Sequence, residues 1–351
     1  MTVLVNLIVA LGRLHVVPAG LRLIDPVRFG RTARLWPLFA APGAVCLWLP
    51  RGAPATALAA VYAAATLALA VRALAPAVRA APGRSSGSGF GFGSGFGSGF
   101  GASSGFGPGP AGVAVLTALV APSVAGTALV AERAGYRLFG FDLDILALTV
   151  PHFHFAGFAA ALVAGLVCRA CAAGALARWA AYSVPAGTGL VLLGYFIDDW
   201  AELVGAVTLT GGMWAVALLT WRDVRTGAGA RDRVTGALLT GSAAVLVATM
   251  LLALWWALGE ATGIAHPTLT WMAATHGLGN ALGFGLCSLL AWRRLTAGPP
   301  GPPTSAPHAP VTLPAAAAPP TPVAAPTPAA LPTPVAPPTP AALPDRTEIP
   351  A

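Results

Sequence analysis

The apolar run Ile145–Val167 sets the strongest limit on what this chain can fold into. Its sequence, ILALTVPHFHFAGFAAALVAGLV, contains no formally charged side chain. About 20 apolar residues allow a helix to cross the roughly 30 Å hydrocarbon core of a bilayer, and this run has that length. It also contains Pro151, His152 and His154. Imidazoles at membrane depth are unfavourable unless they face a partner or a cavity, so they mark a candidate functional site.

Eight other apolar segments accompany this run, which predicts an all-α, polytopic transmembrane bundle of about nine helices. Eight of the segments are firm, and the first is doubtful because it contains Asn6, Arg13 and His15. Only 9% of the residues are charged, whereas soluble domains carry about 25%. The nine segments are Thr2–Ile24, Leu35–Leu49, Ala53–Leu74, Val113–Ala131, Ile145–Val167, Trp179–Ile197, Leu203–Trp221, Val234–Leu258 and Thr268–Trp292.

The charged residues are divided unevenly between alternate loops, which predicts the orientation of the helices. Cytoplasmic loops carry an excess of basic residues, so the arginine-rich loops are predicted to be cytoplasmic. This puts the C-terminus in the cytoplasm and the N-terminus outside a plasma membrane. Charges scattered in this way do not favour nucleic-acid binding. The arginine-rich loops contain Arg22, Arg28, Arg31, Arg34, Arg72, Arg79, Arg84, Arg169, Arg178, Arg222, Arg225, Arg231, Arg233, Arg293 and Arg294, and the others contain Glu132, Asp142, Asp144, Asp198, Asp199, Glu202 and Glu260 with only Arg51, Arg133 and Arg137.

Two low-complexity pieces accompany the membrane segments, one as a linker between segments three and four and one as a tail after segment nine. Residues 1–78 hold segments one to three, and residues 113–294 hold segments four to nine with the histidine motifs. Residues 79–112 are rich in Gly, Ser and Phe, and residues 295–351 are rich in Pro and Ala. These compositions bury too little apolar surface to order the chain, so they predict a disordered cytoplasmic linker and a disordered tail.

Four polar side chains form the candidate site: His152, His154, His276 and Asn280. At 1.5 Å per residue, the three histidines share one level in the outer half of the predicted membrane. Residues 152 and 154 are about 200° apart on a regular helix, so both cannot face one point unless Pro151 distorts the helix. Small residues beside His154 and His276 predict that helices five and nine pack together. His154 would then lie opposite His276, with Asn280 one turn deeper and His152 facing another helix.

Three functions are compatible with these residues. A neutral imidazole can bind a solute or pass protons, as in a transporter, or ligate a metal or haem, as in a membrane enzyme or sensor. His152, His154 and His276 are the candidate metal ligands, but a closed zinc site needs four ligands, and no Cys, Asp or Glu is evident at that depth. The third alternative is packing alone, as in a non-catalytic membrane assembly factor. The expected partners are the lipid bilayer and a small solute or ion, and no cofactor is required.

Three acids lie at the predicted outer end of the seventh segment, in YFIDDWAEL. Asp198, Asp199 and Glu202 form either a vestibule that attracts cations or ordinary solvated loop charges. The sequence contains no nucleotide-binding G-x-x-x-x-G-K loop, no H-E-x-x-H metal motif and no G-x-S-x-G nucleophile motif. A self-contained ATPase or hydrolase is therefore not predicted.

Three stretches carry a family resemblance. At PHFHFAGF (151–158) and THGLGNALGF (275–284), the chain resembles the YndJ-like family of bacterial integral membrane proteins, and HVVPAGLRLID (15–25) is similar to the first characteristic segment of that family. The resemblance covers the membrane core, roughly residues 1–75 and 113–294. It implies a polytopic bacterial membrane protein, sometimes described as transporter-like, without a settled substrate. It also implies that His152, His154, His276 and Asn280 belong to the characteristic motifs of the family.

Overall fold

The described part of the chain consists of residues 2–79, 109–227 and 232–297 of the computed structural model. These residues belong to one unit, Met1–Gly301. The predicted linker and tail, except for a few residues at their ends, lie outside this part. Every regular element in the described residues is helical, which confirms the predicted all-α class.

Each of the nine predicted segments is helical in the described residues. The first segment, doubtful in the sequence, runs as a continuous helical stretch from Thr2 to Ile24. The segments comprise α1 (Thr2–Leu11), η1 (Gly12–Val16) and α2 (Val17–Ile24); α3 (Pro26–Val45) and η2 (Cys46–Trp48); α4 (Ala53–Arg79); α5 (Pro110–Arg133); α6 (Leu143–His152), η4 (Phe153–Ala159) and α7 (Ala160–Ala170); α8 (Ala175–Gly194); α9 (Asp199–Leu219) and η5 (Thr220–Val224); α10 (Arg233–Thr262); and α11 (Leu269–Met272), η7 (Ala273–Gly277), η8 (Gly279–Leu286) and α12 (Cys287–Ala297), with η3 (Leu138–Gly140) in a loop.

Six of these stretches, as described, are long and apolar enough to cross a membrane, which fits a multi-pass membrane protein. They are long enough and have a high enough mean hydropathy to span it, and the doubtful first segment is one of them. The six are Val3–Ile24, Ala53–Ala75, Pro110–Arg133, Leu143–Ala170, Asp199–Val224 and Arg233–Thr262.

Helix α3 begins earlier than the hydropathy predicted. The predicted segment starts at Leu35, and the basic residues before it were expected to lie in a loop. In the structure the helix starts at Pro26, because the Asp25 carboxylate accepts hydrogen bonds from the backbone N–H groups of Val27 and Arg28. A capping carboxylate and a proline in the first turn begin a helix independently of hydropathy.

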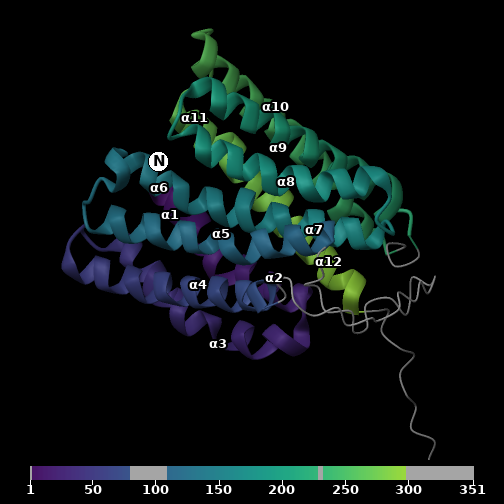
Figure 1. Cartoon of the computed structure of the whole chain (residues 1–351), viewed down its shortest axis with the longest axis horizontal. Coiled ribbons are helices and arrows are strands. Elements are labelled where there is room, and N and C mark those ends of the chain that lie inside the picture. Colours follow the sequence, from purple (N-terminus) through teal and green to yellow (C-terminus); the bar gives the residue numbers. More distant parts are fainter. Residues whose placement is uncertain (1, 80–108, 228–231, 298–351) are drawn as a thin grey trace, which may run out of the picture. The chain divides into compact units, whose positions relative to one another are not determined.

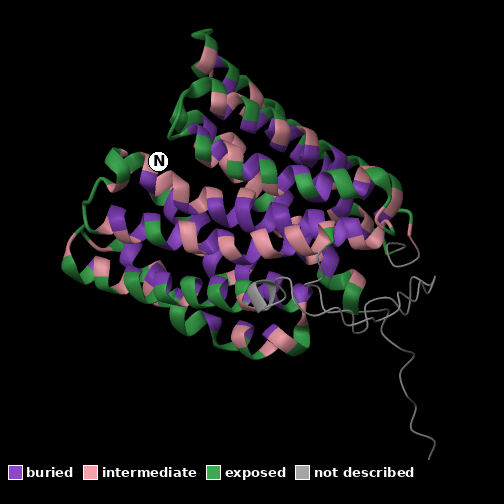
Figure 2. Ribbon diagram, in the orientation of Figure 1, coloured by how far each residue is buried: buried purple, intermediate pink, exposed green. Residues whose placement is uncertain are grey.

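The fifth helical stretch, α6 to α7, forms the centre of the bundle. In its most apolar window 83% of the residues are buried, compared with 33% in α10. It packs against α5 and α8, while α3 and α4 lie on one side of it and α9 and α10 on the other (Figure 1). Buried residues are accordingly concentrated in the middle helices (Figure 2). The central helix therefore has two sides that contact different sets of helices.

Glycines bring α8 and α9 into backbone contact. A Cβ atom added at Gly187 would lie 2.4 Å from the Leu209 nitrogen, and one added at Gly194 would lie 2.4 Å from the Glu202 Cα atom. Gly205 on α9 meets the Val191 backbone in the same way. Small residues at these positions allow two membrane helices to approach closely. This contact sets the position of the first turn of α9, which carries the acidic residues.

An ion pair joins the N-terminal end of α10 to the C-terminal end of α12. Asp232, which caps α10, lies 2.7 Å from Arg294 Nη2, and Arg294 Nε donates to Thr235 Oγ1. Asp232 accepts hydrogen bonds from Arg294 and from the Thr235 N–H and hydroxyl groups, and these bonds lower the pKa of its exposed carboxyl to about 2. The pair connects the last helix to α10 at the predicted cytoplasmic end.

The glycine contact makes a matched prediction within one helix. Gly187→Ala is expected to destabilise the protein by about 1–3 kcal/mol, because the new methyl group overlaps the α9 backbone. Gly189→Ala, two residues along α8, meets nothing within 4 Å and should be neutral or slightly stabilising through its higher helix propensity. Reversible unfolding in detergent measures both changes. Equal stability of the two variants would contradict the close α8–α9 contact.

Candidate functional site

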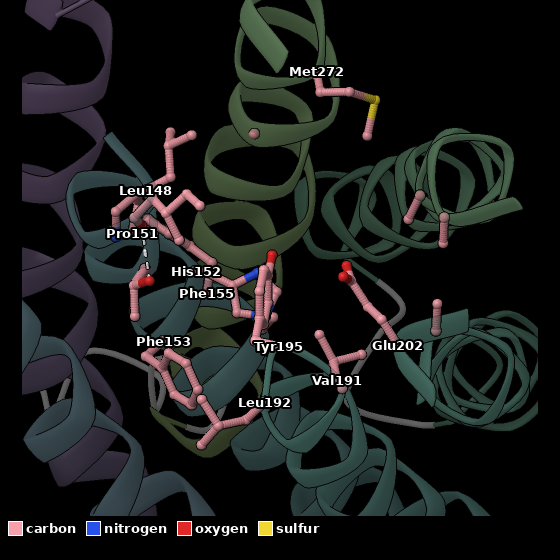
Figure 3. A pocket seen from close by; sticks show the side chains of 18 of the residues that line it. Leu148, Pro151, His152, Phe153, Phe155, Val191, Leu192, Tyr195, Glu202 and Met272 are labelled. Carbon is pink, nitrogen blue, oxygen red and sulfur yellow. Dashed lines mark hydrogen bonds between the residues drawn. The ribbon is translucent and has the colours of Figure 1, made fainter. Parts of the chain in front are cut away.

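A pocket of about 840 Å³ lies inside the bundle, near the ends of the helices that carry the acidic loops. It is lined by the N-terminal parts of α1, α6, α9 and the last helical stretch and by the C-terminal parts of α5, α8 and α10. Most of the lining is apolar. Figure 3 shows His152, Tyr195 and Glu202 extending into this space from separate elements. The polar residues that line it include Thr127, Thr149, His152, Tyr195, Asp198, Asp199, Glu202, Glu260, His266, His276 and Asn280.

His152 is the histidine of the central helix that lines the pocket. It is the last residue of α6, and its ring contacts Phe153 edge to face with the ring centroids 5.5 Å apart. The Nε2 atom is buried and has no hydrogen-bond partner among the described residues. His276 lines the same pocket. A buried nitrogen without a partner at a pocket wall is a group that a bound molecule can satisfy.

His276 and Asn280 form a closed hydrogen-bond group with Thr249 of α10. The His276 Nδ1 atom lies 2.8 Å from the Thr249 carbonyl oxygen, which can only accept, so Nδ1 carries the hydrogen. Nε2 then accepts from Asn280 Nδ2 at 3.0 Å, and Asn280 Oδ1 accepts from the Thr249 hydroxyl at 2.8 Å. The group joins the last helical stretch to α10 and fixes His276 in its neutral form at the pocket wall.

His154 lies in a different group on the other side of the central helix. It is fully buried, and its Nδ1 donates to the Val150 carbonyl oxygen at 2.6 Å, so its Nε2 accepts from the Tyr62 hydroxyl at 2.5 Å. The Arg13 guanidinium lies 4.6 Å from the centroid of the Tyr62 ring and donates to the Gly43 carbonyl. Arg13 is itself fully buried, and its Nε and Nη2 atoms have no partner in the described residues.

The predicted pairing of His154 with His276 is therefore wrong, and His152 takes that place. His152 and His154 do face different surroundings, as their spacing of two residues required. Helices five and nine also contact each other, because a Cβ atom at Gly285 would meet the Phe155 ring at 2.9 Å. The structure brings His152, His276 and Asn280 to one pocket and places His154 with Tyr62 and Arg13.

Four polar residues of the interior lie on π-helical turns. η1 carries Arg13, η4 carries His154, η7 carries His276 and η8 carries Asn280. A π-helical turn holds one more residue than an α-helical turn, so it changes the direction of every side chain that follows. Single turns of this kind are frequent at functional sites. They also explain why the facing directions of a regular helix predicted His154, instead of His152, beside His276.

The three predicted vestibule acids have different surroundings. Asp198 caps α9 by accepting a hydrogen bond from the Ala201 N–H at 2.8 Å. Asp199 and Glu202 follow in the first turn of α9 and line the pocket together with Glu260. Glu260 lies 3.1 Å from His266 Nε2. The negative charge therefore lies at the pocket, as well as in the loop.

The described residues contain no group of three or more His, Cys, Asp or Glu side chains that could hold a metal ion. The three histidines named as candidate metal ligands do not converge, because His154 bonds to Tyr62 and His276 bonds to Thr249 and Asn280. The ring nitrogens of His154 and His276 are all used within the protein, whereas His152 Nε2 has no partner among the described residues.

Comparison with known proteins identifies the family. The model of the YndJ-like protein family matches residues 7–284, which includes the three motif stretches and all the histidines and acids described above. The chain belongs to the YndJ-like family. No curated protein and no solved structure matches this YndJ-like protein.

Two partners in the YndJ-like protein were not predicted from its sequence. Tyr62 lies in the alanine-rich stretch AVYAAAT, where it is the only polar aromatic side chain. Thr249 is one of many threonines on the membrane helices. A tyrosine at membrane depth needs a hydrogen-bond partner for its hydroxyl, and this could have indicated Tyr62. Nothing local distinguished Thr249.

The Tyr62–His154 bond predicts a stability change in this YndJ-like protein. Tyr62→Phe leaves His154 Nε2 buried without a donor, which is expected to cost on the order of 1 kcal/mol, since interhelical hydrogen bonds in membranes are worth about 0.6 kcal/mol on average. Tyr136→Phe removes the hydroxyl of an exposed tyrosine and should have no effect. Unfolding of both variants in detergent measures the difference. An unchanged Tyr62→Phe protein would show that this bond adds nothing to stability.

Proposed function

We propose that this YndJ-like protein is a transporter-like membrane protein that binds a small, partly apolar solute in the pocket beside His152, His276 and Asn280. The observation that carries the proposal is the buried His152 Nε2 atom, which has no partner in the described residues and lies at the wall of a cavity of about 840 Å³. Ligand sites are typically cavities of this size, mostly apolar and with a few polar groups that orient the ligand.

The position of the pocket supports entry from one side of the membrane. Most of its lining lies toward the helix ends that carry the acidic loops. With the orientation given by the arginines, that side is the outside of a bacterial plasma membrane. The opposite ends of the helices are joined by contacts such as the Asp232–Arg294 pair. A transport cycle would have to open this second end.

Solute binding is better supported than proton relay or metal binding. Both ring nitrogens of His276 are engaged, by Thr249 and by Asn280, so a proton passing through His276 would have to break one of these bonds. A metal site needs several converging ligands, and the described residues provide no such group. His152 Nε2 instead offers a hydrogen-bonding group beside apolar walls, which suits an organic solute.

Access from each side of the membrane tests the proposal without a known substrate. Ala253 of α10 lines the pocket and makes no polar contact with the site. In Ala253→Cys, we expect a membrane-impermeant charged maleimide to react from the outside and, as the pocket alternates, also from the inside. The measurement uses right-side-out and inside-out vesicles, and the unaltered protein gives the background of its four native cysteines.

A buried position away from the pocket provides the control. Ala118 of α5 is fully buried and does not line the pocket, so Ala118→Cys should stay unlabelled from both sides. If Ala253→Cys reacted from one side only, a fixed binding pocket, as in a sensor or assembly factor, would replace the transport proposal. If it reacted from neither side, solute access to the pocket would be excluded.

A further inference from the structure

Glu202 is a buried acid without a partner. It is 9% exposed, and its carboxylate makes no hydrogen bond or ion pair with any described residue. Glu132, the other buried acid among the described residues, shows the usual arrangement, because it is paired with both Arg51 and Arg133. A buried carboxylate is strongly unfavourable unless it is paired. In the YndJ-like protein this unpaired carboxylate extends into the pocket (Figure 3).

The charge around Glu202 is negative. Asp199 and Glu260 line the same pocket and lie close enough to act on Glu202 electrostatically. No arginine of the described residues lines the pocket, and His266, which does line it, already contacts Glu260. A low-dielectric cleft lined by one sign of charge attracts ligands of the opposite sign.

Four aromatic side chains lie beside these acids and also line the pocket. Phe141 contacts Phe196 with ring centroids 5.3 Å apart and Tyr195 with centroids 6.2 Å apart, and Phe139 contacts Phe196 at 5.5 Å. All of these contacts are edge to face. Three of the rings remain exposed, with 73% exposure at Phe139, 51% at Phe196 and 40% at Tyr195. Aromatic faces attract cations and contact apolar surface, so these rings suit a bulky organic cation.

We infer that the pocket takes a hydrophobic organic cation, such as an amine or quaternary ammonium compound. Its positive group lies at Glu202, and its apolar body contacts the four aromatic rings and extends toward His152. This inference rests on the proposed function and gives its solute a chemical class. An inorganic divalent cation fits less well, because such ions need several converging oxygen ligands, which the described residues do not provide.

Two probes of the same shape and opposite charge test the inference. Tetraphenylphosphonium and tetraphenylborate are both bulky and apolar and differ mainly in the sign of their charge. Binding of each to the purified full-length protein is measured by equilibrium dialysis in detergent, with binding to protein-free micelles subtracted. We expect tetraphenylphosphonium to bind at least about tenfold more tightly, and Glu202→Gln to remove this preference.

Two further variants make the result specific to Glu202. Glu202→Asp keeps the charge and should retain the preference. Asp144→Asn removes an exposed acid at the start of α6 that does not line the pocket, and it should also retain the preference. Continued binding of tetraphenylborate to Glu202→Gln reports that the pocket is still folded.

The remaining outcomes overturn the inference and separate its failure from that of the proposed function. Equal binding of the two probes, or a preference that survives Glu202→Gln, would show a pocket that binds solutes without selecting cations at this residue. Binding of neither probe would also overturn the cation class. The labelling of Ala253→Cys uses no ligand, so it decides the transport proposal independently of these results.

Discussion

A bilayer interior contains no water to satisfy polar groups, and this constraint accounts for the arrangement of the YndJ-like bundle. Each buried polar side chain needs a partner from the protein itself. The His276 group meets this need fully, with every ring nitrogen and amide atom of the pair occupied. His152 and Glu202 do not meet it. These two residues lie at the wall of one pocket, where an external molecule would complete their hydrogen bonding.

The central helix connects the two polar regions of the molecule. His152 and His154 lie two residues apart on it, yet one faces the pocket and the other faces Tyr62 on α4. A movement of this helix would therefore change both regions together. Arg13 is part of the second region, where its guanidinium contacts the Tyr62 ring and the Gly43 carbonyl. Such an arrangement depends on close packing around the guanidinium.

The fold could be predicted from the sequence to a large extent because hydropathy and charge are local properties. The apolar segments each became a helix, and the doubtful first segment formed one as well, since Arg13 finds partners inside the bundle. The start of α3 was missed because the cap at Asp25 acts through hydrogen bonds that hydropathy does not register. Position along a helix follows from counting residues, and His152, His154, His276 and Asn280 each lie within a helical segment, as their positions in the apolar runs predict.

The contacts between the site residues were harder to predict than the positions of these residues in the sequence. Facing directions were calculated for regular helices, and the π-helical turns at 153–159 and 273–277 change those directions. The partner of His154 is Tyr62, which lies 92 positions earlier in the chain. Such a long-range contact has no local signal. The unpaired state of Glu202 likewise depends on which helices surround it, and α10 supplies Glu260 there instead of an arginine.

The π-helical turns have a consequence for how the last helical stretch can move. Each contains one residue more than an α-helical turn. The π-helical turn can therefore move along the helix while the backbone hydrogen bonds change at only one turn at a time. Passing it by one turn rotates the intervening side chains by about 100°, while the helix axis stays in place. Between residues 273 and 286 the stretch is π-helical apart from Leu278. A rotation of this kind at η7 would turn the imidazole of His276 away from the cavity while the tilt of the helix stays the same.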